Sequence, residues 1–328
     1  MTETIVLTCP SGKQSTHLIP LLIQTKRFHL RLAAHSAASK DHLESEYPET
    51  EVVQVDLTSL PDCERLLAGT TAIHHVGPSF HSREKEMGFN LIDAAVSEIQ
   101  KPDSVFKHFV FSSVLSTQHR NLMQHDLKSR VEERLFLSPL NFTILQPTNF
   151  LAGYPVAHLA EQSMPSFERL WNPDTANSLI ALEDLAEASA RVLIERERHY
   201  FAQYPLCSTL PISDRDVVRT IEKHLGKKIE IVTPSFEKGV QNTLTFLFGA
   251  RESNDWVQSD LDSPGAEGDL RPDITRDEAE RLPMVSNSPD FYHGRQEPVE
   301  WGACFQLRDE LYTGQTSDTD DATLILPS

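Results

Sequence analysis

A histidine and a lysine lie three residues apart in a predicted helix, where together they could carry out proton transfer. The apolar positions that define this helix, predicted over 122–137, recur in steps of four at Leu127, Val131 and Leu135. His125 and Lys128 occupy positions i and i+3 and therefore share a helix face. A histidine exchanges protons near neutral pH, so the pair is a candidate for acid–base chemistry. The alternative is an ordinary solvated helix face.

A short loop near the N-terminus has the position and spacing of a phosphate-binding turn between a strand and a helix. A dinucleotide's pyrophosphate lies on amide groups at such a helix start, so glycines there keep side chains away. In the spacing G-x-x-G-x-x-G only Gly12 remains, with Cys9 and Ser15 at the flanking positions. Cys9 adds a β-carbon where the turn is tightest, and Pro10 removes an N–H. The loop is therefore either a modified phosphate site or a turn that binds nothing.

The cysteines and the adjacent histidines give little support for a metal centre. Four cysteines are scattered without paired spacing, which indicates reduced thiols in an intracellular protein. His74 and His75 lie in a predicted buried strand and are expected to be core residues, and we predict no metal site. Cys9, beside a helix start, could have a lowered thiol pKa and act as a redox sensor.

Strands and helices alternate along the first part of the chain, which is typical of βαβ units. Strands are predicted over 5–9, 28–34, 52–56, 71–76, 106–111 and 142–147. The intervening helices are predicted over 14–24, 61–68, 84–99 and 122–137. Less regular elements follow, with strands over 178–181, 204–208 and 229–232 and helices over 183–195 and from Ser213 to Gly226. The fold class is therefore α/β, a Rossmann-like doubly wound parallel sheet with a smaller C-terminal α/β substrate lobe.

Composition divides the 328 residues into three regions. Residues 1–150 are predicted to form the dinucleotide-binding domain, and 151–250 the substrate lobe, some of whose strands could return to the sheet. Residues 251–328 are predicted to be an acidic, partly disordered linker and tail, with 290–312 docked on the body. This last region contributes −12 of the net charge of −18.

The same features exclude several classes of partner. The acidic balance argues against nucleic acid, which requires a basic face. The apolar runs are too short to span a bilayer, and the N-terminus lacks the pattern of a signal peptide. We therefore expect a cytoplasmic protein that does not bind membranes.

Several stretches taken together resemble the NmrA-like group of atypical short-chain dehydrogenases, over roughly residues 4–235. The stretches that carry the resemblance are Thr8-x-x-x-Gly12-Lys13-Gln14 with Leu18-Ile19, Phe111-Ser112-Ser113-Val114, His125-Asp126-Leu127-Lys128 with Val131-Glu132-Glu133, and Ile144-Leu145-Gln146-Pro147-Thr148-Asn149-Phe150. This resemblance implies a nicotinamide dinucleotide as cofactor. The residues that it implies for cofactor binding are Ser11, Gly12, Lys13, Gln14, His35, Asp56, Leu57, Gly77, Pro78, Phe80, Lys128, Pro147, Asn149 and Phe150.

The end of the second predicted strand bears on which nucleotide is bound. An NAD site places an acidic residue there, and an NADP site places a positive group. Here the strand ends in Ala34-His35-Ser36 with Lys40 beyond it, and no carboxylate occurs until Asp41. NADP(H) is therefore favoured over NAD, and the alternative is an ordinary solvated loop.

The resemblance also assigns catalytic roles. In short-chain dehydrogenases a tyrosine four residues before the lysine donates a proton, and the lysine holds the nicotinamide ribose. Gln124 stands at the tyrosine position in this chain, which leaves Lys128 and His125 as the candidate catalytic groups. Ser113, with Ser112 beside it, matches the active-site serine.

We therefore predict an NADP(H)-dependent reductase of a small hydrophobic or aromatic metabolite. One alternative is a non-catalytic NADP-binding sensor or regulator that acts through a protein partner. Another is a redox-neutral cyclase or isomerase on a degenerate scaffold. The partner expected in each enzymatic case is a small-molecule substrate, and a homodimer or a regulatory protein partner is left open.

Overall fold

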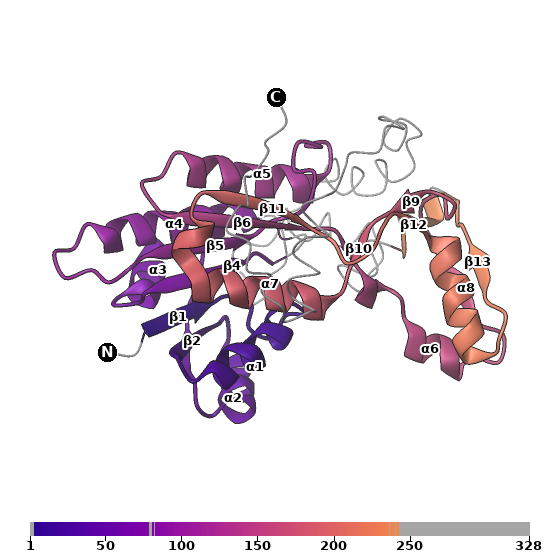
Figure 1. Ribbon diagram of the computed structural model, residues 1–328, viewed down its shortest axis with the longest axis horizontal. Coiled ribbons are helices and arrows are strands. Elements are labelled where there is room, and N and C mark those ends of the chain that lie inside the picture. Colours follow the sequence, from indigo (N-terminus) through magenta and orange to yellow (C-terminus); the bar gives the residue numbers. More distant parts are fainter. Residues whose placement is uncertain (1–2, 79–80, 82, 236, 240, 243–328) are drawn as a thin grey trace, which may run out of the picture. The chain divides into compact units, whose positions relative to one another are not determined.

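The structure is a computed structural model that describes residues 3–78, 81, 83–235, 237–239 and 241–242. The predicted tail (251–328, with 290–312) and Phe80 lie outside the described residues. A seven-stranded parallel sheet has the order β11-β6-β5-β4-β1-β2-β3 (Figure 1). Its strands are β1 (Glu3–Leu7), β2 (Phe28–Ala34), β3 (Glu51–Gln54), β4 (Ala72–Val76), β5 (His108–Ser112), β6 (Phe142–Pro147) and β11 (Ala202–Leu206). This order confirms the doubly wound sheet, whose direction of travel reverses between β1 and β4.

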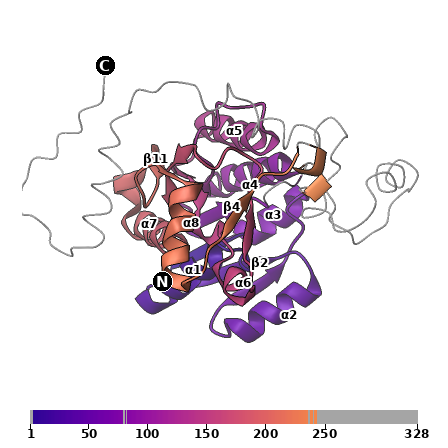
Figure 2. The same cartoon turned by 90° about the vertical axis from the view of Figure 1, so that its right-hand side faces the viewer.

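Helices cover both faces of the sheet (Figures 1 and 2). Those that belong to the sheet layers are α1 (Ser15–Thr25), α2 (Ala37–Glu46), α3 (Leu60–Leu67), α4 (Glu84–Ile99), α5 (Met123–Phe136) and α7 (Leu182–Glu195). α1 packs against α7, whereas α3, α4 and α5 pack side by side on the opposite face. Gly88 lets α4 approach α5, because a β-carbon there would lie 2.6 Å from Val131 Cγ2. One cluster of buried apolar residues lies between this second layer and the sheet, and buried residues of α1 and α7 lie on the opposite face.

The helix α2 is absent from the sequence prediction. Leu43 is its only buried residue, so the helix has no apolar stripe to reveal it. It is nevertheless capped, because the Ser36 hydroxyl accepts a hydrogen bond from the Ser39 N–H at 3.2 Å. The strand predicted over 5–9 ends early, at Leu7. Its extended backbone stops before Cys9, whose φ of 47° lies in the left-handed region.

The chain after β6 contributes both to the sheet and to a smaller set of elements. β11 becomes the edge strand beside β6, so one strand of the region 151–250 does return to the sheet. The remaining elements are β7 (Asn149–Phe150), α6 (Val156–Glu161), β8 (Ser166–Glu168), β9 (Ala176–Asn177), β10 (Leu179–Ile180), β12 (Ile212–Ser213), α8 (Asp214–Leu225) and β13 (Glu230–Val232), with 3₁₀ turns at Leu151–Gly153 and Arg196–His199. A separate apolar cluster includes Tyr154, Phe167, Val218 and Ile221.

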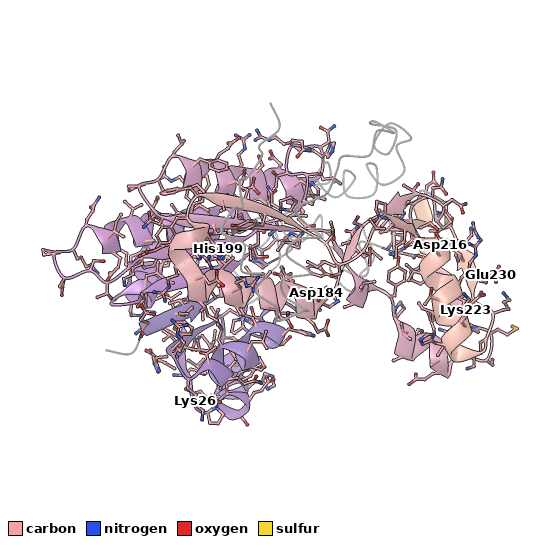
Figure 3. The ribbon with its side chains drawn as sticks, viewed as in Figure 1. Lys26, Asp184, His199, Asp216, Lys223 and Glu230 are labelled. Atoms are coloured by element: carbon pink, nitrogen blue, oxygen red, sulfur yellow. The ribbon has the colours of Figure 1, made fainter. Side chains whose placement is uncertain are left out.

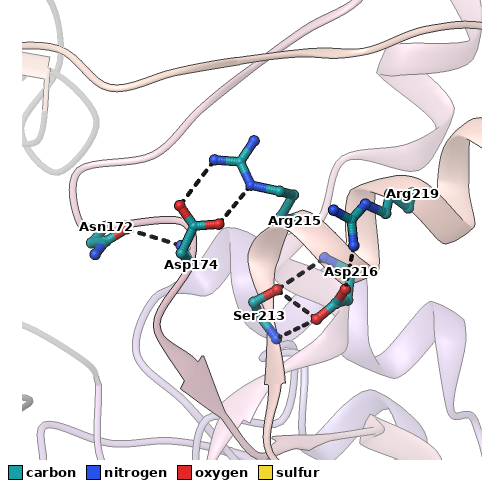
Figure 4. Close-up of polar contacts among 6 residues, drawn as sticks. All are labelled: Asn172, Asp174, Ser213, Arg215, Asp216 and Arg219. Carbon is teal, nitrogen blue, oxygen red and sulfur yellow. Dashed lines mark hydrogen bonds and ion pairs between the residues drawn. The ribbon is translucent and has the colours of Figure 1, made fainter.

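The ends of α8 follow the sequence prediction. Ser213 and Asp216 form a capping box, in which the Ser213 hydroxyl accepts from the Asp216 N–H at 3.1 Å (Figure 4). Gly226 ends the helix with a φ of 64°. Asp216 in the first turn and Lys223 in the last turn complement the helix dipole (Figure 3). Among the described helices, none combines the length and apolarity required to cross a bilayer.

Candidate functional site

A cavity of about 1150 Å³ lies at the carboxyl ends of β1, β2, β3 and β4. This is the point where the strand order reverses, and it is where open α/β sheets bind their ligands. The cavity is lined by residues 9–15, 33–37 and 39, 54–57 and 76–78, and by His81, Met87 and Phe150. Four segments that are far apart in the sequence thus meet at one site.

Most of the predicted cofactor-binding residues meet in this cavity. Those in its lining are Ser11, Gly12, Lys13, Gln14, His35, Asp56, Leu57, Gly77, Pro78 and Phe150. The predicted residues that do not line it are Lys128, His125, Ser113, Pro147 and Asn149. The structure therefore brings most of the predicted cofactor-binding residues to one cavity, whereas the candidate catalytic residues lie outside its lining.

The loop after β1 forms a tight turn at Gly12. The Gly12 N–H donates to the Cys9 carbonyl oxygen at 2.9 Å, and a β-carbon at position 12 would lie only 3.0 Å from that oxygen. The turn itself therefore requires glycine at this position. Ser15 is fully buried, and its hydroxyl donates to the Thr8 carbonyl oxygen at 3.3 Å. Serine at the third glycine position thus still permits close packing of α1 on β1.

Cys9 occupies the first glycine position in a strained conformation. Its left-handed φ of 47° costs a residue with a β-carbon about 1–2 kcal/mol. Burial of its thiol, with a smaller contribution from the nearby Glu84 charge, raises the pKa of Cys9 to about 12. The expectation of a lowered thiol pKa at Cys9 is therefore wrong, because the thiolate is disfavoured.

The buried end of β4 is held against the loop. The Thr8 hydroxyl accepts from the Val76 N–H at 2.8 Å and donates to the Val76 carbonyl oxygen at 3.0 Å.

The adjacent histidines His74 and His75 in β4 are core residues, as predicted. Burial lowers the pKa of His74 to about 4 and that of His75 to about 3, so both are neutral at physiological pH. Within the described part of the chain, no group of three or more His, Cys, Asp and Glu side chains is arranged to hold a metal ion.

Lys128 forms a buried ion pair with a residue that the sequence did not single out. Its Nζ lies 2.5 Å from Glu84 Oε1, and the two side chains are 4% and 1% exposed. The amine also lies 5.5 Å from the centre of the Phe111 ring. Burial raises the pKa of Glu84, and the Lys128 charge opposes that rise. The second carboxylate oxygen, Glu84 Oε2, is buried and has no hydrogen-bond partner within the described part of the chain.

Gly77 leaves the room that this ion pair occupies. A β-carbon at position 77 would lie 2.4 Å from Glu84 Oε1 and 2.8 Å from Glu84 Cγ. The Glu84 carboxylate therefore packs directly on Gly77, which itself lines the cavity. Gly77 therefore separates the ion pair from the space that the ligand would fill. The sequence places Glu84 at a helix start, but nothing in the pattern shows that it turns inward toward Lys128.

The other catalytic candidates are bonded within the protein. The Ser113 hydroxyl donates to Glu132 Oε1 at 2.5 Å in the core. His125 Nδ1 lies 2.9 Å from the Ser116 carbonyl oxygen, so this nitrogen carries the proton in neutral His125. Burial is the main cause that lowers the pKa of His125 below its ordinary value. His125 is therefore neutral at pH 7, and its Nε2 is suited to accept a proton.

The end of β2 presents polar groups without a carboxylate. His35 is exposed, and it lines the cavity together with Ser36 and Ser39 at the start of α2. The Asp56 carboxylate lies across the cavity after β3, where it accepts hydrogen bonds from Thr58 at 2.8 and 2.6 Å. This arrangement offers a helix start and hydroxyl groups to an anionic ligand at β2.

The sequence profile of the NmrA-like family matches residues 1–252. The chain belongs to the NmrA-like family. Among curated proteins, no sequence matches this NmrA-like chain. The family membership agrees with the resemblance carried by the four sequence stretches.

Solved structures share the fold of this NmrA-like protein. An NADPH-dependent quinone oxidoreductase from Escherichia coli in complex with NADPH is 19% identical, with a TM-score of 0.61 over 74% of this chain and 82% of that chain. A triphenylmethane reductase from Citrobacter sp. in complex with NADP(H) is 17% identical, with a TM-score of 0.62 over 76% and 85%. A double mutant of NmrA is also 17% identical, with a TM-score of 0.60 over 76% and 82%. At these identities the similarity shows the fold.

Replacing Gly77 by alanine should disrupt the Glu84–Lys128 pair. The added β-carbon overlaps the carboxylate, so we expect the free energy of unfolding to fall by about 1–3 kcal/mol, as for other overpacked cores. Urea denaturation measures this change. Gly153→Ala is the matched control, because a β-carbon there meets nothing within 4 Å. Equal stabilities for the two variants would show that Glu84 does not occupy this space.

His125 should titrate below the pH at which a free histidine does. Because its folded-state pKa is lowered, the unfolded chain takes up the proton first as the pH falls, and the contribution of His125 to stability decreases with it. NMR titration of the imidazole resonance, assigned with a His125→Gln variant, measures this pKa. A midpoint at or above the ordinary histidine value would contradict the buried, neutral assignment.

Proposed function

We propose that this protein is an NADP(H)-dependent reductase of a small hydrophobic or aromatic metabolite. The observation that carries the proposal is the cavity at the reversal of strand order, which the loop around Gly12 and the ends of β2, β3 and β4 line together. At about 1150 Å³ it is large enough for a dinucleotide, since ligand pockets commonly measure about 300–1,000 Å³.

The residues around the cavity fit the two anionic parts of NADP(H). The pyrophosphate would lie on the loop at Ser11 and Gly12, before the N-terminus of α1. The 2′-phosphate would lie at His35 and Ser36, where the N-terminus of α2 adds its positive dipole end. A carboxylate at that point would repel the phosphate, and the cavity lining contains none between residues 33 and 39. NADP(H) is therefore favoured over NAD.

The substrate would lie against the apolar side chains of the cavity. Met87, Pro78 and Phe150 line it beyond the loop, which supports a hydrophobic or aromatic molecule. The quinone oxidoreductase and the triphenylmethane reductase that share the fold are named for cyclic unsaturated substrates, and both structures contain the cofactor that we propose here.

When bound, NADPH supplies a hydride to the substrate. Lys128 would stabilise the negative charge that develops, and it would bind the nicotinamide ribose as the family resemblance implies. Gln124 has no acidic proton to donate, and the lowered pKa of His125 leaves it neutral at pH 7. We therefore assign to the Lys128 ammonium the role of charged hydrogen-bond donor during hydride transfer.

A second function, a non-catalytic NADP(H) sensor, is supported by the contacts that Lys128 and Ser113 make within the protein. Lys128 is paired with Glu84, and the Ser113 hydroxyl is bonded to Glu132, so neither is presented to the cavity. A protein that binds NADP(H) without reducing a substrate, and that signals through a protein partner, would tolerate this arrangement. We rank it second, because the solved structures that share the fold include reductases.

Oxidation of NADPH with a panel of quinones and aromatic dyes tests the reductase. We expect turnover by the wild type, and Lys128→Ala should lower kcat on the order of 10²-fold. Lys223→Ala, at an exposed position on α8 (Figure 3), is the matched control and should leave kcat unchanged. NADPH binding without turnover on the whole panel would favour the sensor, and an unchanged rate for Lys128→Ala would remove Lys128 from the reaction.

A further inference from the structure

Lys128 is held away from the cavity by a contact that the proposed reaction must break. Its amine bonds to Glu84 Oε1 at 2.5 Å, and the amine does not line the cavity. Both side chains are almost fully buried. The ammonium has three donor hydrogens, but the Glu84 contact holds it outside the cavity lining, so the amine must change position to reach the ribose of a nicotinamide nucleotide.

The Glu84–Lys128 contact is close to the cavity, and it leaves one oxygen of the Glu84 carboxylate without a hydrogen bond from Lys128. Glu84 packs on Gly77, and the Cys9 thiol is near enough to Glu84 and Lys128 for both charges to affect its pKa. Gly77 and Cys9 both line the cavity. Among the described residues Glu84 Oε2 has no hydrogen-bond partner, so the buried carboxylate carries a desolvation penalty that Lys128 only partly offsets. Such a pair can exchange one partner for another when a ligand supplies polar groups.

We propose that Glu84 is a positioning residue that sequesters Lys128 until the nicotinamide half of the cofactor binds. The inference rests on the proposed binding of NADP(H). Glu84 then favours the position of the Lys128 amine outside the cavity, and the ribose hydroxyls favour a position toward the cavity. Apparent affinity for the nicotinamide half is reduced by the fraction of molecules in which Glu84 holds the lysine. The adenosine half, which binds at the Gly12 loop and at His35, does not experience this competition.

Two ligands distinguish binding at the nicotinamide half of the site from binding at the adenosine half. NADPH contains both halves, whereas adenosine 2′,5′-bisphosphate contains the adenine and the 2′-phosphate but no nicotinamide. In Glu84→Gln the carboxylate charge is removed and the shape is kept, so Lys128 is released more easily. We expect the Kd for NADPH to fall by about tenfold and the Kd for the bisphosphate to stay within about twofold, as measured by calorimetry.

A double variant supplies the matched control. In the Lys128→Met background there is no amine to release, so adding Glu84→Gln should leave the NADPH affinity unchanged. A general structural effect of Glu84→Gln would instead appear in both backgrounds and with both ligands. If the Glu84→Gln chain fails to fold, Glu84→Asp provides the second test, because its shorter side chain holds Lys128 less closely and should give a smaller gain in NADPH affinity.

The outcomes separate this inference from the proposed function. An NADPH affinity that is unchanged or weaker in Glu84→Gln, with the bisphosphate still bound, would overturn the sequestering role and leave NADP(H) binding intact. Equal changes for both ligands would also overturn it. If the wild type binds neither ligand, NADP(H) binding itself is contradicted, and the role of Glu84 is contradicted with it.

Discussion

The buried ion pair between Glu84 and Lys128 is the interaction on which the rest of the site depends. It joins the first turn of α4 to α5 beneath the cavity wall, and its two charges are removed from water. Losing one partner of such a pair typically destabilises a protein by about 3–5 kcal/mol, because the other charge remains buried. Gly77 is required by this pair as much as by the ligand, since any side chain there would displace the carboxylate. The same contact determines whether the lysine can reach a ligand.

The phosphate loop shows how a dinucleotide turn can persist after losing two of its glycines. Cys9 adopts the left-handed backbone conformation that the first glycine would provide, at an energetic cost that the surrounding bonds must offset. Thr8 fixes the loop to the end of β4 through two hydrogen bonds to Val76. Ser15 packs where the third glycine would stand. The shape of the turn is therefore preserved by neighbouring contacts, although Pro10 still removes one amide donor.

The sequence predicted the sheet, and it singled out many of the residues that line the cavity, because both depend on local patterns. Strand–helix alternation gave the fold, and Gly12, His35, Asp56 and Gly77 each follow a predicted strand, so the topology brings them to one edge. The helix α2 was missed because its single buried residue leaves no periodicity. Glu84 was missed because a contact over 44 positions leaves no local pattern. The Cys9 thiol was misjudged because burial, which the sequence does not display, raises its pKa.

We infer that the loop from Cys9 to Ser15 still binds a dinucleotide. Calorimetric titration of the purified, nucleotide-free chain with NADPH and with NADH tests it most directly. We expect micromolar affinity for NADPH and clearly weaker affinity for NADH, because the proposed site for the 2′-phosphate lies at His35 and Ser36. Millimolar or weaker affinity for both nucleotides would show that the turn is only a structural remnant, and it would contradict the account.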